Sequence, residues 1–137
     1  MNTRATVQEL LSRIGSGDPE HIAAMYAEQV DWQLSWPAEE HGGSVPWIRH
    51  RSTRADVADH YRELAAHHQT GRAAAEIAAI VVDGDDAVVT GTLTNVLRRN
   101  GQRYDARFAL HLTVAGGLVT RHHVYEDSLA VLRAFSR

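Results

Sequence analysis

Two spacings of apolar residues alternate along the chain, and each spacing predicts one kind of element. Residues 7–14 place apolar side chains at i, i+3, i+4 and i+7 before Gly15, which predicts an amphipathic helix. Asp18 before Pro19 is typical of the start of a second, short helix. Thr53 followed three residues later by Asp56 predicts the capped start of a third helix.

Alternating apolar and polar residues predict strands in the rest of the chain. The predicted strands are 30–36, 72–82, 87–98, 103–114 and 118–127, and a short helix follows around Leu129 to Leu132. The Asn100-Gly101 pair between two of these strands is a strong hairpin signal. Residues 37–52 hold two prolines and two glycines and are expected to form a long loop. Helices first and a mostly antiparallel sheet second predict an α+β fold.

The strand 103–114 fixes which side of the sheet faces the core. Its even positions from Tyr104 to Val114 are apolar and its odd positions are mostly polar, so the even face should point inward. The neighbouring strand then carries Leu93 and Asn95 inward on its own apolar face. In the last strand, RHHVYED, the pattern alone leaves open whether His122 or His123 points inward.

Composition narrows the function classes. A chain of 137 residues is expected to form one domain, residues 1–137. The net charge of −3 comes without a basic block, so no nucleic-acid partner is expected. No cysteine is present, which excludes thiolate metal sites and cysteine nucleophiles. We read no signal peptide and no membrane-spanning apolar stretch, and we expect a cytoplasmic protein.

The order of elements resembles a known superfamily. Helices, a strand in YAEQVDW, a loop ending in PWIRHRSTRADVADHY and hairpins closing on GLVTRHHVYEDSLAVL resemble the NTF2-like superfamily, and most of all its SnoaL-like branch. This resemblance implies a cone in which N-terminal helices pack on a curved, mostly antiparallel sheet around a deep pocket. Related proteins include polyketide cyclases, ketosteroid isomerases, limonene epoxide hydrolases and non-catalytic binding domains. Relatives also commonly dimerise through the outer face of the sheet.

The same resemblance tests known catalytic machinery. Laid along the epoxide hydrolases, the chain has Asn95, Leu93 and Val124 at the positions of their aspartate, arginine and second aspartate. The catalytic acids of the ketosteroid isomerases fall on Leu34 and near Phe108. The chain therefore lacks the catalytic residues of both mechanisms. The resemblance also implies that His122, Val124 and Glu126 face inward and His123 faces outward.

A ligand site follows from these positions. Ten residues are expected to line the pocket, and Trp47 is expected to close its mouth; the ten are Trp32, Leu34, Trp36, Tyr61, Leu93, Asn95, Phe108, His122, Val124 and Glu126. Such an aromatic lining suits a small hydrophobic or aromatic ligand, for example a flat polycycle. His41 and His50 in the long loop are expected near the entrance.

Three of the lining residues are candidates for catalysis without a cofactor. We expect His122 and Glu126 to lie about 7 Å apart on one strand face, where they would exchange protons with a carbonyl substrate. Asn95 would donate a hydrogen bond to a developing enolate oxygen. This predicts an acid–base cyclase or isomerase acting on a polyketide-like or polycyclic carbonyl compound. In the alternative readings, His122 is a satisfied core residue, Glu126 is solvated, and Asn95 bonds Tyr104 or a water.

Two further function classes stay open. A non-catalytic small-molecule binding domain would keep the pocket without the chemistry, and a protein-interaction subunit would have a filled core. We expect no metal site, because the nine histidines show no ligand spacing, and we expect most of them at the surface. The outer sheet face should carry a homodimer contact formed by Arg103, Asp105, Arg107, His111, Arg121, His123 and Tyr125.

Overall fold

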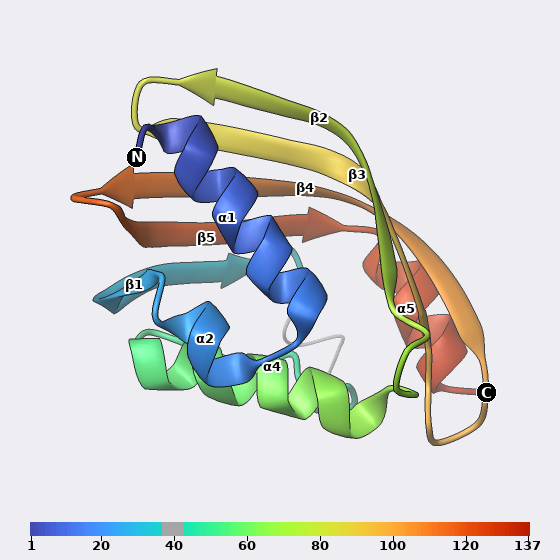
Figure 1. The fold of residues 1–137 in the computed structure, drawn as a ribbon. Helices are drawn as coiled ribbons and strands as arrows, with labels where there is room; N and C mark the ends of the chain where they lie inside the picture. The colour runs from blue at the N-terminus through green and yellow to red at the C-terminus, as the bar shows by residue number, and fades with distance from the viewer. Residues whose placement is uncertain (37–42) are drawn as a thin grey trace.

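A curved five-stranded sheet with helices on its concave side forms the body of the molecule in the computed structural model (Figure 1). The structure describes residues 1–36 and 43–137. The strands are β1 (Tyr26–Leu34), β2 (Ala74–Asp83), β3 (Asp86–Val96), β4 (Arg103–Ala115) and β5 (Leu118–Glu126). Their order in the sheet is β1-β5-β4-β3-β2. All neighbours are antiparallel except β1 and β5, so the α+β prediction is confirmed.

The helices begin and end where the sequence predicts caps. They are α1 (Thr3–Ser16), α2 (Pro19–Ala23), α4 (Arg54–His67) and α5 (Ser128–Phe135). Gly17 ends α1 in a left-handed conformation, and Asp18 caps α2. The capping box at the start of α4 is formed: the Thr53 hydroxyl accepts from the Asp56 backbone, and the Asp56 carboxylate accepts from Thr53 N.

One boundary differs from the sequence prediction and matters for the site. Tyr26 belongs to β1, which starts four residues earlier than the predicted strand at Val30. Parallel pairing with β5 extends the strand, since Val119 N donates to Met25 O and Tyr26 lies opposite Val119. The side chain of Tyr26 is therefore fully buried on the inner side of the sheet.

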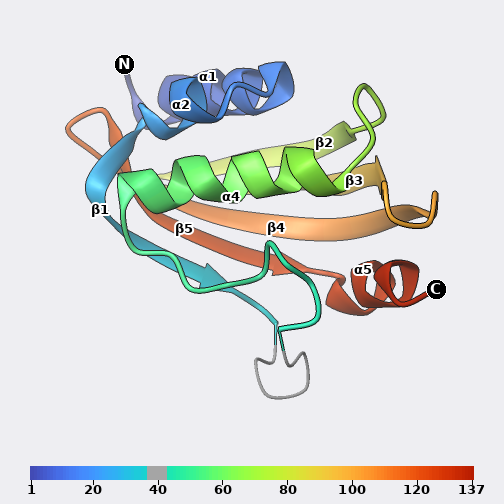
Figure 2. The same ribbon diagram turned by 90° about the horizontal axis from the view of Figure 1, so that it is seen from below.

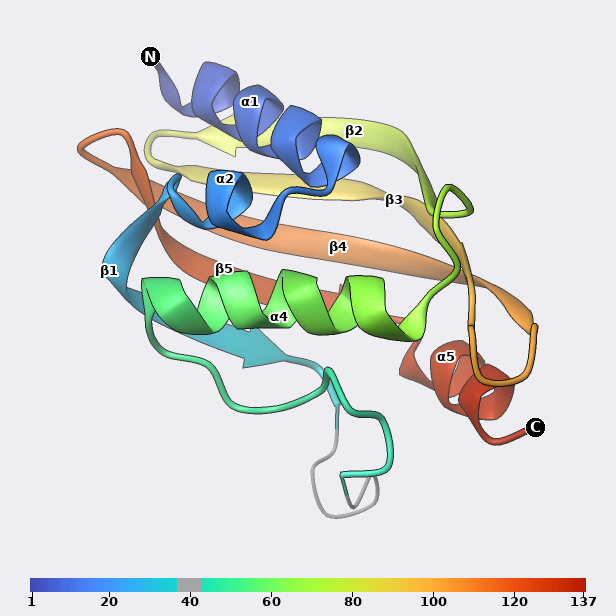
Figure 3. The same ribbon diagram turned by 60° about the horizontal axis from the view of Figure 1, so that its bottom comes forward.

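The helices close the concave side from two directions. Figures 2 and 3 show α1, α2 and α4 on one side of the sheet, with α5 at the end where the β3–β4 turn lies. The buried residues divide into two clusters. The first cluster lies under α1, α2 and the start of α4 and includes Val7, Leu10, Ile22, Tyr26, Trp32, Val57, Leu110, Leu112 and Val119. The second cluster lies toward α5 and includes Trp36, Val45, Trp47, Leu97, Tyr104, Ala106, Val131 and Phe135.

A bulge in β2 depends on one glycine. The pairing of β2 with β3 shifts between Ile77 and Ala79, and Gly91 of β3 lies beside this shift. A Cβ on Gly91 would come within 2.2 Å of the backbone oxygen of Glu76, so no other residue fits without a shift of the backbone.

No helix in the described part of the chain is long and apolar enough to cross a membrane.

Candidate functional site

The side chains that point to the inner face of the sheet are the ones that the sequence predicts. On β4, Tyr104, Ala106, Leu110 and Leu112 are buried, whereas the side chains between them are exposed or half-buried. His122 is 3% exposed and points inward. The ring of His123 lies on the other face, where Nε2 is 3.0 Å from Asp31 Oδ2. The predicted orientation of the two histidines is therefore confirmed.

His122 is held by two aromatic residues of β1. Its Nδ1 lies 2.8 Å from the hydroxyl of Tyr26, and its ring stacks on Trp32 with centroids 3.8 Å apart and planes 6° apart. Burial lowers the pKa of His122 well below its usual value, and the neighbouring rings of His60 and His123 add to the shift. The imidazole is therefore neutral at neutral pH.

Two residues of α4, His60 and Tyr61, lie against Tyr26, Trp32 and His122, and we call these five residues the first polar group. Tyr61 bonds Tyr26, and burial raises the pKa of Tyr61 to about 12. His60 packs edge-on against Trp32 with centroids 4.8 Å apart, and burial lowers its pKa to about 3. Within the described residues, Trp32 Nε1 and His60 Nδ1 are buried without a hydrogen-bond partner. Such groups weaken a fold unless something satisfies them.

Glu126 and Trp36 form a second polar group at the other end of the inner face. The Oε1 of Glu126 accepts a hydrogen bond of 2.6 Å from the indole Nε1 of Trp36. Burial raises the pKa of the Glu126 carboxyl; the Trp36 hydrogen bond opposes this shift and the nearby Asp127 adds to it. The carboxyl is half-buried, so the reading of a freely solvated side chain does not hold.

The spacing expected between His122 and Glu126 is wrong. The two residues are four positions apart in β5, and at about 3.3 Å per residue their backbones are separated by about 13 Å. His122 contacts the first cluster and Glu126 bonds Trp36 of the second. They do not act on one atom of a ligand from these positions.

Asn95 is also apart from the other two candidates. It pairs with Tyr104 across β3 and β4, while Glu126 pairs with Phe108 four residues further along β4. The side-chain oxygen of Asn95 accepts from the backbone nitrogen of Val96 at 2.9 Å. The structure therefore does not gather the three predicted catalytic residues at one point.

The expected deep aromatic cavity is largely filled. Trp32, Trp36 and Trp47 are 5%, 8% and 4% exposed, so they pack as core residues. The other predicted lining residues keep some accessible surface, and we call them the half-buried strip: Leu34, Tyr61, Leu93, Asn95, Phe108, Val124 and Glu126. Leu34 contacts both clusters, so the strip runs between them.

Two surface hollows lie away from most of the predicted lining. One, of about 320 Å³, lies over β2, β3 and β4 and is lined by Glu76, Ala78, Thr90, Gly91, Thr92, Arg107 and Phe108. The other, of about 420 Å³, lies between α2 and α4 and is lined by Glu20, Ala23, Ala24, Arg54 and Ala55. Phe108 is the one predicted lining residue that takes part in either.

The long loop differs from its predicted role as an entrance. Trp47 does not close a mouth; its ring packs 4.6 Å from that of His68 within the second cluster. His50 is exposed, and His41 lies outside the described residues. The expectation that most histidines are at the surface fails for His60, His68 and His122, which are buried.

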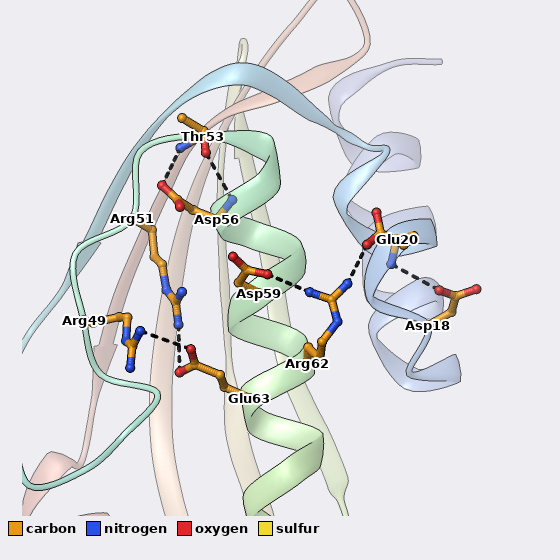
Figure 4. A network of polar contacts seen from close by, with 9 residues as sticks. All are labelled: Asp18, Glu20, Arg49, Arg51, Thr53, Asp56, Asp59, Arg62 and Glu63. Atoms are coloured by element: carbon orange, nitrogen blue, oxygen red, sulfur yellow. Dashed lines mark hydrogen bonds and ion pairs between the residues drawn. The ribbon is translucent and has the colours of Figure 1, made fainter.

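Charged residues fasten this loop to α4 (Figure 4). Arg51 is 3% exposed, and its Nη2 lies 3.2 Å from Glu63 Oε2. Arg49 reaches the other oxygen of the same carboxylate at 3.3 Å. On the far side of α4, Arg62 bonds both Asp59 and Glu20, which ties α4 to α2. These contacts hold α4, which carries His60 and Tyr61 and is followed directly by His68.

Sequence reasoning missed two residues that contact the candidates and one hydrogen-bonded pair beside them. Tyr26 contacts His122 and His60 contacts Trp32, while His68 bonds Tyr104 in the second cluster. The helical spacing of Val57, Tyr61, Leu64 and His68 indicated that His68 faces inward. The sequence holds no comparable signal for His60, because its burial depends on the loop that covers it. Elsewhere in the described ranges, no three His, Asp or Glu side chains are grouped so as to hold a metal ion.

Comparison with protein families identifies the group. Residues 7–122 match the family described as "SnoaL-like domain". The chain belongs to this SnoaL-like family. No curated protein sequence matches it significantly. The predicted membership of the NTF2-like superfamily and of its SnoaL-like branch is thereby confirmed.

Solved structures share the fold of this SnoaL-like domain at low sequence identity. An NTF2-like protein of Burkholderia pseudomallei K96243 superposes with a TM-score of 0.83, 18% identity, and coverage of 100% of this chain and 99% of that one. An NTF2-like protein of Burkholderia thailandensis E264 superposes with a TM-score of 0.82 and 18% identity, covering 98% of this chain and 97% of that one. TerC, crystallised with polyporic acid, superposes with a TM-score of 0.80 and 17% identity, covering 98% of each chain.

Proposed function

We propose that this SnoaL-like domain binds a small aromatic or polycyclic carbonyl compound along the half-buried strip and moves a proton on it without a cofactor. The reaction would be an isomerisation or a cyclisation of a polyketide-like substrate. Membership of the SnoaL-like family supports a ligand-binding or cyclase/isomerase type of function in general. The finer assignment depends on the chemistry of Glu126.

The state of the Glu126 carboxyl is the observation that carries this proposal. General acid–base catalysis is most effective when the pKa of the group lies near the working pH, and burial moves the pKa of Glu126 in that direction. The Trp36 indole holds one oxygen of the carboxyl at 2.6 Å and so fixes its orientation. The residue is half-buried rather than fully enclosed.

The apolar part of the strip supports the ligand class. Leu34, Tyr61, Phe108 and Val124 offer partly exposed surface packed against the first cluster, and Phe108 pairs with Glu126 across β4 and β5. Flat aromatic compounds suit such a lining because they bury apolar area at low entropic cost. TerC, a protein with the same fold, was crystallised with polyporic acid, which is consistent with an organic acid as ligand.

His122 and Asn95 keep secondary roles in the proposal. His122 is the second candidate for proton transfer, and Asn95 is the candidate donor to an enolate oxygen. Their distance from Glu126 means that each would act on a different part of an extended ligand. Trp32, Trp36, Trp47 and Leu93 would contribute to binding through the packing that shapes the strip.

The test uses the exchange of the acidic protons of β-tetralone, an aromatic ketone, in deuterated water. The unmodified protein is expected to accelerate this exchange, and Glu126→Gln is expected to lower the rate about 100-fold or more while β-tetralone still binds. Glu76→Gln, an exposed carboxylate on β2, is the matched control and should keep the full rate. Equal rates for the unmodified protein and Glu126→Gln would contradict the proposed chemistry.

A non-catalytic ligand-binding domain is the second candidate function. Apolar residues at Leu34 and Phe108, where the ketosteroid isomerases carry acids, favour it. It predicts binding of β-tetralone without faster exchange in any variant. A pure protein-interaction subunit predicts neither binding nor exchange.

We also propose that two copies associate through the outer face of the sheet. Tyr125 on this face is 54% exposed, and the hollow lined by Glu76 and Arg107 lies on the same sheet beyond β4. The other charged residues of the predicted contact are mostly paired within the chain, such as Arg103 with Asp105 and Arg121 with Asp31. An exposed aromatic ring and a hollow on one face are complementary in a two-fold arrangement.

A further inference from the structure

Three segments that are far apart in the sequence meet at one end of the molecule. They are the end of α4 with the connection to β2 (residues 67–72), the β3–β4 turn with its flanks (residues 96–103), and α5 with the residues after it (128–137) (Figures 1 and 3). Together they contain six of the 14 arginines of the chain and none of its 17 acidic residues. This end is therefore basic, although the chain as a whole has a net charge of −3.

Hydrogen bonds hold the first two of these segments together. The backbone nitrogen of Gln69 donates to Val96 O at 2.8 Å, and the backbone nitrogen of Arg98 donates to His67 O at 3.0 Å. The guanidinium of Arg98 also donates to the hydroxyl of Thr70 at 3.1 Å. The connection after α4 is therefore fixed beside the end of β3.

The third segment, α5, is tied to the same turn. Asn100 Nδ2 donates to Ala134 O at 2.8 Å and to Arg137 O at 3.3 Å. The guanidinium carbon of Arg99 lies 4.9 Å from the centroid of the Phe135 ring, which is a cation–π contact. The arginines of α5 and those of the turn therefore belong to one end of the molecule.

The arginines at this end differ from most of the others because they have no acidic partner. Within the part of the chain that the structure describes, six arginines have a carboxylate oxygen within 4.0 Å, and of these only Arg103 belongs to the three segments. The remaining five are exposed and make no ion pair with a described residue. We call them the arginine end: Arg72, Arg98, Arg99, Arg133 and Arg137. Like charges repel one another, so their grouping does not stabilise the fold.

Two kinds of anionic partner fit this end poorly. A small anion needs a pocket, whereas the five arginines are spread over three segments and the two hollows described above lie elsewhere. A nucleic acid is a long polyanion that would extend past this end, where all 17 acidic residues of the chain would repel it. A compact acidic surface can touch the arginines alone. Its carboxylates suit arginine, since the planar guanidinium binds a carboxylate through two N–H groups.

We propose that the arginine end is a docking surface for an acidic protein, whose carboxylates pair with these guanidinium groups. The inference does not rest on the proposed function, because none of the five arginines belongs to the half-buried strip or to the predicted dimer contact. Docking would supply the acidic partners that the chain itself does not provide here.

The test measures the binding of a fluorescent oligoglutamate peptide by anisotropy at low salt. The unmodified protein should bind the peptide, and binding should weaken as the salt is raised to about 0.15 M, which screens charges over about 8 Å. Arg99→Gln combined with Arg133→Gln should weaken binding about fivefold or more, because each exposed ion pair contributes a modest part.

The matched control removes the same charge elsewhere. Arg4 and Arg107 are exposed, make no ion pair with a described residue and lie outside the arginine end. Arg4→Gln combined with Arg107→Gln should change binding by less than about twofold. Equal weakening by the two double variants would show that only net charge matters and would overturn the inference.

Other results would also overturn it. The peptide would then fail to bind, be displaced by inorganic phosphate at equal concentration, or bind more weakly than an oligothymidylate of the same charge. Mass growth at low salt that Arg99→Gln with Arg133→Gln abolishes would instead assign this end to the acidic β2–β3 turn of another copy. If that variant does not fold, NMR of the unmodified protein decides: the peptide should shift the signals of Asn100 and Phe135, and shifts confined to other residues contradict the proposal.

Discussion

His60 and His122 both pack against Trp32 as neutral, buried imidazoles. Burial is the largest cause that lowers the pKa of each, and the mutual repulsion of the charged forms adds to it for His122. An unfolded chain binds a proton on each histidine near pH 6.5, whereas the folded chain does not. Protonation therefore favours the unfolded state as the pH falls, and this part of the stability is present in full only above that pH.

Acid should destabilise the protein through His60 in particular. With a folded pKa of about 3, this residue alone should lower the free energy of unfolding by about 2 kcal/mol between about pH 7 and about pH 5. His60→Phe keeps a ring against Trp32 and should remove that part of the pH dependence. Urea unfolding of both proteins at the two pH values measures it, and equal losses in both would contradict the assigned burial.

The residues that the sequence did not reveal share a physical cause. The inward orientation of the His122 side chain could be expected from the resemblance of β5 to relatives. The inward orientation of Phe108 could be expected from the alternation of apolar and polar residues along β4. The contacts of His122 with Tyr26 and His60 depend on the early start of β1 and on the loop that covers α4. Those are tertiary effects, which a local pattern does not encode.

At the scale of elements, the pairing of β2 with β3 depends on the absence of a side chain at Gly91. Because β2 is an edge strand, nothing on its other side within the described residues compensates for a loss of this pairing. The helix caps at Asp18, Thr53 and Asp127, by contrast, could be predicted from sequence because each depends on residues within three positions.

Gly91→Ala should weaken the β2–β3 pair. The new Cβ would collide with the backbone of Glu76, and overpacking of this kind lowers the free energy of unfolding by about 1–3 kcal/mol. Gly15→Ala is the matched control: it lies in α1 with open space around it and should stabilise the helix by up to about 1 kcal/mol. Denaturant unfolding compares the two, and similar effects of both substitutions would refute the role of Gly91.

At the scale of the whole molecule, the sheet separates two faces with different tasks. Its concave face carries the two polar groups and the half-buried strip, and its convex face carries ion pairs, the hollow near Gly91 and Tyr125. The α+β architecture could be predicted because element order and alternation extend over the whole chain. The filling of the cavity could not, since it depends on how three tryptophans pack.

The proposed association of two copies makes a specific prediction for the convex face. Light scattering should give twice the chain mass for the unmodified protein and the chain mass for Tyr125→Asp, because a buried unpaired charge opposes the contact. Leu129→Asp introduces the same charge at an exposed apolar residue of α5 and should leave the dimer intact. A monomer for the unmodified protein, or dissociation by both variants, would rule out this interface.

The most direct test of the central claim is where a ligand binds. Addition of β-tetralone should shift the NMR signals of side chains in the half-buried strip, namely Leu34, Tyr61, Leu93, Phe108 and Val124, together with the carboxyl of Glu126. Val81 and Tyr125, which are exposed on the convex face, should keep their signals unchanged. Shifts confined to the convex face, or none at a ligand concentration that saturates binding, would contradict the account.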